Sequence, residues 1–182
     1  MMGINRTEES IYIPDPNLRR VLEKMINPPS LRNRSLSEKT LKKVRHLYMD
    51  NEKIRDLSGI EWCKNVESLY LMDNPIEDLS PLYALKKLRI LDVSRVPYIR
   101  WWQLTEPFSS VEELYLRSCE LESDSLLRLF PNVRIVSLFH NHIEHIDTLY
   151  SLPHLESVDL RHNPIPDTAV EAFHNHTGVG FL

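Results

Sequence analysis

The chain has 182 residues, of which 42% are hydrophobic, enough to bury the core of a single domain. Its formal net charge of -4 argues against a binder of nucleic acid or of anionic membranes, which usually carries a basic face. There is no run of about 18 apolar residues to span a membrane, and the first ten residues hold no apolar signal segment. We therefore expect a cytoplasmic protein, or a secreted or surface protein if a leader has been removed.

The N-terminal part is predicted to be a flexible segment, residues 1–10, followed by a helical cap, residues 11–43. Asp15 can accept hydrogen bonds from the amides of a first helical turn, and Pro16 suits the first helical position. Apolar side chains then recur on one helical face before a proline pair ends the helix. They are Leu18, Val21, Leu22 and Met25.

A second short helix is expected over residues 36–43, with Ser35 as its cap and Glu38 in capping-box spacing. Helices placed in this way cover the open end of a stacked core.

A period of 22 residues organises residues 44–166. The first position of each repeat recurs at steps of 22 or 23 residues, at Val44, Val66, Leu88, Val111, Val133 and Leu155. The fourth and sixth positions are apolar in all six repeats, and a turn follows them. This pattern predicts six stacked repeats, each with one short strand whose fourth and sixth positions point inward.

The C-terminal cap is predicted over residues 167–182. A helix is expected over residues 168–173, with Glu171 in capping-box spacing. Residues 179–182 are typical of the start of another strand. They either pair beside the sixth strand or leave a sheet edge open to another molecule, including a second copy in a weak dimer.

Three stretches carry a resemblance to known repeats. IRDLSGIE at 54–61 and IEDLSPL at 76–82 resemble the 22-residue repeats of bacterial internalin-like proteins and of protein-phosphatase regulatory subunits. IPDPNL at 13–18 resembles the first helix of the internalin-like set. The resemblance implies an α/β fold, a right-handed leucine-rich-repeat solenoid with about six short parallel strands on a concave face that binds other proteins. It names no ligand and no cofactor.

The ninth position departs from the repeat pattern in the middle of the chain. Asn74, Asn141 and Asn163 can satisfy buried backbone groups of adjoining turns with their amides, whereas Glu52, Val96 and Cys119 occupy the same place in the other repeats. We therefore expect irregular turns where the asparagine is missing. Cys119 and Cys63 lie at inward positions three repeats apart, too far for a disulfide, and are expected to be small buried hydrophobic residues.

Trp101 and Trp102 follow the one-residue insertion in the third repeat. The preferred interpretation is that one tryptophan fills the core while the other packs against a neighbouring arm. The alternative is an exposed aromatic anchor for a partner.

The candidate binding residues lie on the concave face, to which positions three, five and seven point, with position eight at its edge. Tyrosine, methionine, phenylalanine and arginine at these positions are enriched in protein interfaces, and aspartates would set polarity. The predicted partner-binding set is Tyr48, Asp50, Tyr70, Met72, Asp73, Arg95, Tyr115, Arg117, Phe139, His140, Asp159 and Arg161. Charge is predicted to change from acidic at the N-terminal end to basic at the C-terminal end, which would orient a complementary partner.

The second position alternates in charge along the stack, which predicts a ladder of ion pairs between neighbouring repeats. Its members are Arg45, Glu67, Arg89, Glu112, Arg134 and Glu156.

No catalytic or cofactor site is expected, because four scattered glycines form no phosphate loop and both cysteines point inward. His140 and His162 share position eight in adjacent repeats, but unfilled surface histidines are preferred over a metal site. We expect a non-catalytic module that binds a protein partner and neither nucleic acid nor a membrane. The open alternatives are a regulatory subunit of an enzyme such as a phosphatase, an internalin-like fragment that binds a host surface protein, and a metal-dependent function at the histidine-rich end.

Overall fold

The computed structural model describes residues 11–27 and 35–182, and the predicted flexible segment at residues 1–10 lies outside them. In the described chain, seven parallel strands form one sheet in the order of the sequence. They are β1 (His46–Tyr48), β2 (Ser68–Tyr70), β3 (Ile90–Asp92), β4 (Glu113–Tyr115), β5 (Ile135–Ser137), β6 (Ser157–Asp159) and β7 (Gly180–Phe181). The seventh strand lies in residues 179–182 and pairs beside the sixth, which is one of the two arrangements expected for these residues.

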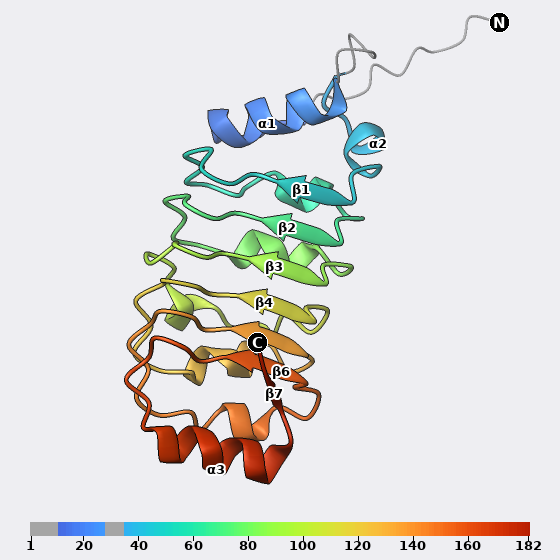
Figure 1. The fold of residues 1–182 in the computed structure, drawn as a ribbon. Helices are drawn as coiled ribbons and strands as arrows, with labels where there is room; N and C mark the ends of the chain where they lie inside the picture. Colours follow the sequence, from blue (N-terminus) through green and yellow to red (C-terminus); the bar gives the residue numbers. More distant parts are fainter. Residues whose placement is uncertain (1–10, 28–34) are drawn as a thin grey trace, which may run out of the picture.

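Each repeat is one turn of a coil. Residues paired in adjacent strands are 22 or 23 apart, as in His46 with Ser68 and Ile90 with Glu113, so the sequence period is the register of the sheet. Between strands the chain returns on the other side of the sheet through short 3-10 helices (Figure 1). These helices span Ile60–Trp62, Ser80–Ala84, Trp101–Gln103, Ser125–Leu129 and Leu149–Ser151.

The core runs through the middle of the coil. The side chains at positions four and six are fully buried in every repeat except for Leu160, which is 7% exposed. They are Leu47, Met49, Leu69, Leu71, Leu91, Val93, Leu114, Leu116, Val136, Leu138, Val158 and Leu160. Since burial of one such side chain stabilises a fold by about 1.5–3 kcal/mol, this spine confirms the predicted inward positions and holds the repeats together.

The turn that follows each strand is regular along the whole stack. Position eight adopts a left-handed conformation in all six repeats, with φ between 53° and 59°. The prediction of irregular turns in the middle is therefore wrong at this position, because the coil needs the same change of direction after every strand. Irregularity appears two residues later instead, where Lys53 and Glu120 also have positive φ, of 61° and 57°.

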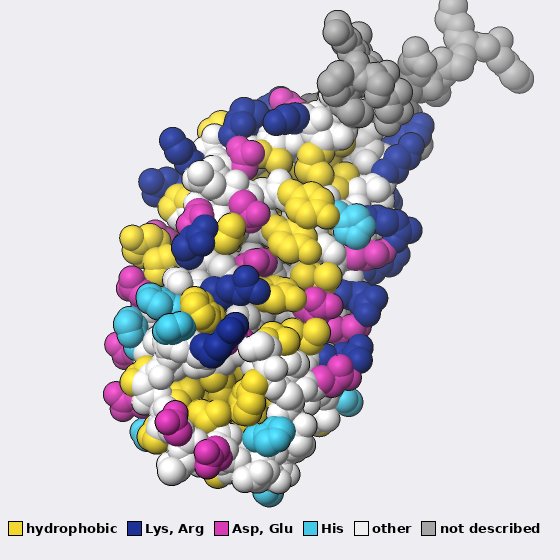
Figure 2. All heavy atoms as spheres, in the orientation of Figure 1, with side chains coloured by type: hydrophobic (Ala, Val, Ile, Leu, Met, Phe, Trp, Pro, Cys, Tyr) yellow, Lys and Arg dark blue, Asp and Glu magenta, His cyan; other side chains and the backbone are white. Residues whose placement is uncertain are grey.

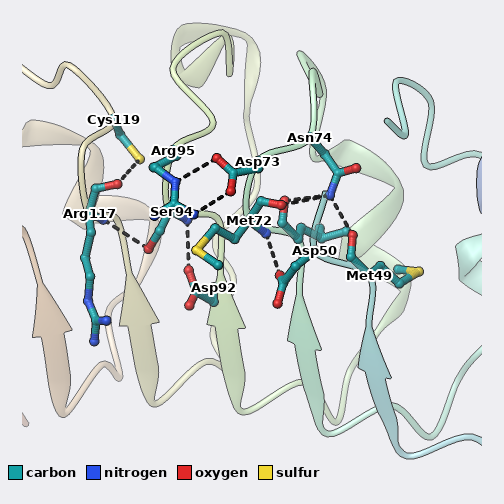
Figure 3. A network of polar contacts seen from close by, with 11 residues as sticks. Met49, Asp50, Met72, Asp73, Asn74, Asp92, Ser94, Arg95, Arg117 and Cys119 are labelled. Carbon is teal, nitrogen blue, oxygen red and sulfur yellow. Dashed lines mark hydrogen bonds and ion pairs between the residues drawn. The ribbon is translucent and has the colours of Figure 1, made fainter. Parts of the chain in front are cut away.

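The asparagines at position nine bind the backbone as predicted. Each side-chain oxygen accepts a hydrogen bond from a backbone N–H of the preceding repeat, and each side-chain nitrogen donates to carbonyls of its own and the preceding repeat, at 2.7–3.1 Å. These bonds satisfy polar groups that would otherwise be buried without partners. Figure 3 shows Asn74 reaching the carbonyl of Met49.

Both cysteines are free and buried, as expected. Cys119 replaces the asparagine in the fourth repeat, and its thiol lies 3.3 Å from the carbonyl of Val93. Burial raises the pKa of Cys63 to about 12 and that of Cys119 to about 11, so neither forms a thiolate near neutral pH.

The N-terminal end of the core is covered by α1 (Pro16–Ile26), which begins and faces the core as predicted (Figure 1). Asp15 caps this helix with one carboxylate oxygen, which accepts from the amides of Asn17 and Leu18 at 2.8 and 3.0 Å. Its other oxygen accepts from the amides of Arg55 and Asp56 in the first repeat, at 2.8 and 3.1 Å. One carboxylate therefore joins the cap to the solenoid.

The second helix, α2 (Glu38–Leu41), begins later than predicted. Its capping box is made by Ser37 and Thr40, whose side chains bond each other's backbone amides. The predicted pair of Ser35 and Glu38 was therefore wrong, because Ser37 supplies the extended cap residue and lies buried at the helix start.

The C-terminal end is covered by α3 (Asp167–Thr177), across the opposite end of the stack from α1 (Figure 1). This helix is longer than the predicted one, has Pro166 at its cap position, and shows no side-chain capping bond, so the predicted capping role of Glu171 was wrong. After α3, strand β7 pairs with the first two residues of β6. A weak dimer through this edge stays a prediction.

Candidate functional site

The concave face is the side of the sheet that points away from the core, formed by positions three, five and seven with position eight at its edge. Hydrophobic side chains gather over the middle of this face, with acidic and basic groups around them (Figure 2). The strands fix its spacing, since neighbouring strands lie about 4.8 Å apart and residues two apart on one strand share a face.

At the N-terminal end, Tyr48 and Tyr70 stack face to face. Their ring centroids are 5.1 Å apart with an interplanar angle of 8°. Tyr48 is 65% exposed and Tyr70 is half-buried. Stacked rings at adjacent register positions offer a flat, rigid contact area that loses little conformational entropy on binding.

Carboxylates surround this pair. The charge of Asp73 is compensated by Arg95, whose guanidinium donates a hydrogen bond to its carboxylate at 2.7 Å (Figure 3). This hydrogen bond holds the pKa of Asp73 below its usual value. Asp50 instead accepts a hydrogen bond from the backbone amide of Met72, and Asp92 accepts one from that of Ser94, both at 2.8 Å. No cationic side chain in residues 11–27 or 35–182 lies within ion-pair distance of either.

Further along the stack, Tyr115 lies beside Asp92 and donates a hydrogen bond to Glu113 at 3.0 Å. Burial, together with this carboxylate, raises the pKa of Tyr115 to about 12. The guanidinium of Arg117 lies over the Tyr115 ring, 5.0 Å from its centroid.

At the C-terminal end, Arg161 lies over the ring of Phe139 at 5.6 Å and donates to Asp159 at 2.9 and 2.8 Å. Asp159 is only 5% exposed. Burial alone would raise its pKa, but the hydrogen bonds and charge of Arg161, together with the charge of Arg117, outweigh burial and hold the pKa of this carboxyl below its usual value. Asp159 was expected to set surface polarity, and the structure instead neutralises it in place.

Fewer unpaired charges therefore contribute to the charge gradient along this face than the sequence predicts. Asp73 and Asp159 each pair with an arginine of the same face, so the acidic end depends on Asp50 and Asp92. Arg117 remains the basic group without an acidic partner on this face of the described chain. Asp92 is the residue that sequence reasoning left out of the binding set, although its place at position five between Tyr70 and Tyr115 was readable from the period.

The histidines at position eight lie on the edge of this face. The rings of His140 and His162 are 6.3 Å apart, and His162 meets Phe139 edge-on at 4.9 Å. Across the residues that the structure describes, no three His, Cys, Asp or Glu side chains gather where they could hold a metal ion. Likewise, no helix in the described ranges is long and apolar enough to cross a membrane.

The charge ladder at position two forms as predicted. Arg45 pairs with Glu67, Arg89 with Glu112 at 2.6 Å, and Arg134 with Glu156 at 2.6 Å. These exposed pairs contribute at most about 1 kcal/mol each to stability. All of their residues except Arg45 line an open hollow of about 930 Å³, but their charges are already matched to one another.

The two tryptophans of the third repeat differ in their surroundings. Trp101 is half-buried and meets Phe130 edge-on at 6.3 Å, as expected for a core contact. Trp102 is 79% exposed and Tyr98 beside it is 65% exposed. The expectation that the second tryptophan packs against a neighbouring arm was therefore wrong.

We expect Trp101→Ala to lower the free energy of unfolding by about 1–3 kcal/mol, because it removes a half-buried ring that packs on the core. Trp102→Ala should change it by no more than about 0.5 kcal/mol, since its ring is in solvent. Urea unfolding of the two variants measures both. A comparable loss for the two variants would contradict these assignments.

Solved structures with the same coil are found by comparison. An internalin C2 from Listeria monocytogenes matches with a TM-score of 0.69 and 25% identity over 85% of this chain and 67% of that chain. An internalin (inlF) from the same organism shares the fold, with a TM-score of 0.64 and 22% identity over 93% of this chain and 56% of that chain. The family model described as Leucine Rich repeat matches residues 151–173. The chain has the leucine-rich-repeat solenoid fold.

Among curated proteins, the leucine-rich-repeat chain is similar to receptor-like protein 7 of Arabidopsis thaliana, with 33% identity over 132 residues. The match covers 65% of this chain but 13% of that relative, so the chain spans a small part of the curated relative's length. The likeness therefore concerns the repeats.

Proposed function

We propose that this leucine-rich-repeat chain is a protein-binding module that holds its partner on the concave face. The observation that carries the proposal is the row of aromatic side chains along the sheet, from the stacked Tyr48 and Tyr70 through Tyr115 to Phe139. The inward positions already supply the core, so the scaffold does not need aromatic residues on this side. Aromatic and arginine side chains are the groups that dominate binding energy in protein interfaces.

The rigidity of the face supports the same conclusion. Each strand is held by parallel pairing to its neighbours, and the asparagines and aspartates fix the turns at the edge of the face. A surface that is formed before binding loses little entropy when the partner docks. The module acts by presentation of fixed side chains, and no step of it requires catalysis.

A capture experiment tests the proposal. The wild-type chain is immobilised and exposed to lysate of the source organism, beside a triple variant in which Tyr48, Tyr70 and Phe139 are replaced by alanine. Because interface aromatic residues commonly contribute about 2 kcal/mol or more each, the triple variant should lose more than a hundredfold in affinity for the captured protein. Circular dichroism checks that both chains are folded.

A matched control replaces three exposed aromatic residues that lie off the concave face, Tyr12, Tyr98 and Trp102, which are 77%, 65% and 79% exposed. This variant should capture the same protein as the wild type. Loss of capture in the control, with capture kept in the concave-face variant, would place the binding surface elsewhere. The captured protein also decides between the narrower predictions, an enzyme such as a phosphatase or a host surface protein.

A further inference from the structure

The aromatic rings of the concave face differ in what covers them. Two rings in the C-terminal half are covered by arginines of the chain itself, Tyr115 by Arg117 and Phe139 by Arg161. Within the described ranges, no lysine or arginine lies over the rings of Tyr48 and Tyr70. The N-terminal pair is thus an aromatic surface without the cation that the other rings have.

The repeat explains the difference. Arg117 occupies position seven, two residues after Tyr115 on the same face and about 6.7 Å along the strand. Arg161 also occupies position seven, beside Phe139, which has that position in the preceding repeat. In the first and second repeats, position seven is Asp50 and Met72 instead. Where the fourth and sixth repeats place a guanidinium, the first repeat places a carboxylate.

The charges around the tyrosine pair are negative and not balanced locally. Asp92 lies directly beside Tyr70 in the sheet, and Arg95, the nearby cation, is held by Asp73. Burial, together with the nearby Asp92 and Asp73, raises the pKa of Asp50. Each of Asp50 and Asp92 accepts a backbone amide hydrogen bond with one oxygen, and its other oxygen accepts no hydrogen bond from the described residues (Figure 3). Asp50 is exposed and Asp92 is half-buried.

We propose that Tyr48, Tyr70, Asp50 and Asp92 together bind an arginine side chain on an extended segment of the partner protein. The guanidinium lies over the tyrosine pair, as that of Arg117 lies over Tyr115, and donates N–H bonds to the available carboxylate oxygens. This inference rests on the proposed function, because it places the partner on the same face and adds the chemistry of one contact.

A peptide titration tests the contact directly. The probe is acetyl-Gly-Arg-Gly-Arg-Gly-amide, compared with the same peptide in which citrulline, a neutral analogue of nearly the same shape, replaces arginine. Followed by NMR of the intact chain at low salt, the arginine peptide should shift the Tyr48 and Tyr70 ring signals and bind about tenfold more tightly than the citrulline peptide. Its affinity should fall as ionic strength rises.

Two matched double variants distinguish this contact from an effect of the net charge of the protein. The double variant Asp50→Asn and Asp92→Asn keeps an oxygen to accept the Met72 and Ser94 amides, so it should fold normally and bind the arginine peptide about tenfold more weakly. The control double variant, Glu122→Gln and Glu144→Gln, removes the same number of charges from exposed residues off the concave face and should bind as the wild type does.

Equal affinity for the arginine and citrulline peptides, or equal weakening by the two double variants, would overturn the arginine site. If capture still depends on Tyr48, Tyr70 and Phe139 in that event, the concave face stays the binding surface and only the arginine contact is removed. If capture is also independent of those three residues, the proposed function itself fails.

Discussion

Replacing Asn141 by alanine is expected to lower the free energy of unfolding by about 3–5 kcal/mol. The side-chain amide makes four hydrogen bonds of 2.8–3.1 Å with backbone groups of two adjoining repeats and a fifth, of 3.4 Å, with the carbonyl of Phe139. Asn141 is only 3% exposed. Alanine would leave the Leu116 carbonyl and the N–H groups of Cys119 and Leu121 without partners, whereas the Leu138 carbonyl keeps its bond from Asn163. Each such group costs about 1–3 kcal/mol, and water entering the space would relieve part of the sum.

Thermal unfolding measures this loss, and a chain of this size should lose roughly 2–4 °C in Tm for each kcal/mol. The matched control is Asn132→Ala, since Asn132 is an exposed asparagine whose amide donates to one backbone carbonyl, that of Ser109 at 2.8 Å. This control should cost less than about 1 kcal/mol. Similar losses for the two variants would show that the buried amide is not what holds the adjoining turns.

Replacing Asp15 by alanine is expected to cost about 2–4 kcal/mol and to release the N-terminal cap from the first repeat. The change removes the acceptor for four backbone amides, two in α1 and two in the first repeat. A helix cap alone is worth about 0.5–2 kcal/mol, and the second pair of buried bonds adds to it. Asp78→Ala is the control, because Asp78 is exposed and bonds only locally, to Ser80.

The contribution of Asp15 is also expected to depend on pH. Burial alone would raise its pKa, but the backbone amides of Arg55, Leu18, Asp56 and Asn17 together outweigh burial and hold the pKa of Asp15 below its usual value. Because the folded pKa is lower than the unfolded one, the charge stabilises the fold above about pH 4 and this stabilisation is lost as pH falls through the folded pKa.

The isosteric variant Asp15→Asn isolates this effect. Its amide nitrogen cannot accept a hydrogen bond, so two backbone N–H groups lose their acceptor while the shape is kept. Urea unfolding from pH 7 to pH 2.5 should show the stability difference between wild type and variant shrinking below about pH 4. A difference that stays constant through this range would mean that the Asp15 charge does not hold the cap.

The sequence by itself determined the coil. Steps of 22 or 23 residues between Val44, Val66 and Leu88 set which residues pair in the sheet, because one full turn of chain separates a residue from its partner on the next strand. The same period identified the buried positions and the asparagines that satisfy the turns. These features depend on local spacing and on the need to bury apolar side chains, both of which are readable in a single chain.

Only the tertiary structure decided the character of the concave face. The sequence placed four charged residues on this face without indicating ion pairs between them. The structure pairs Asp73 with Arg95 and Asp159 with Arg161. Asp50 and Asp92 differ from the other carboxylates of this face because no lysine or arginine of the described chain pairs with them. Which charges cancel is settled by side-chain directions and by distances of a few ångströms between strands, and a repeat pattern specifies the position of a residue but not the partner that its side chain finds.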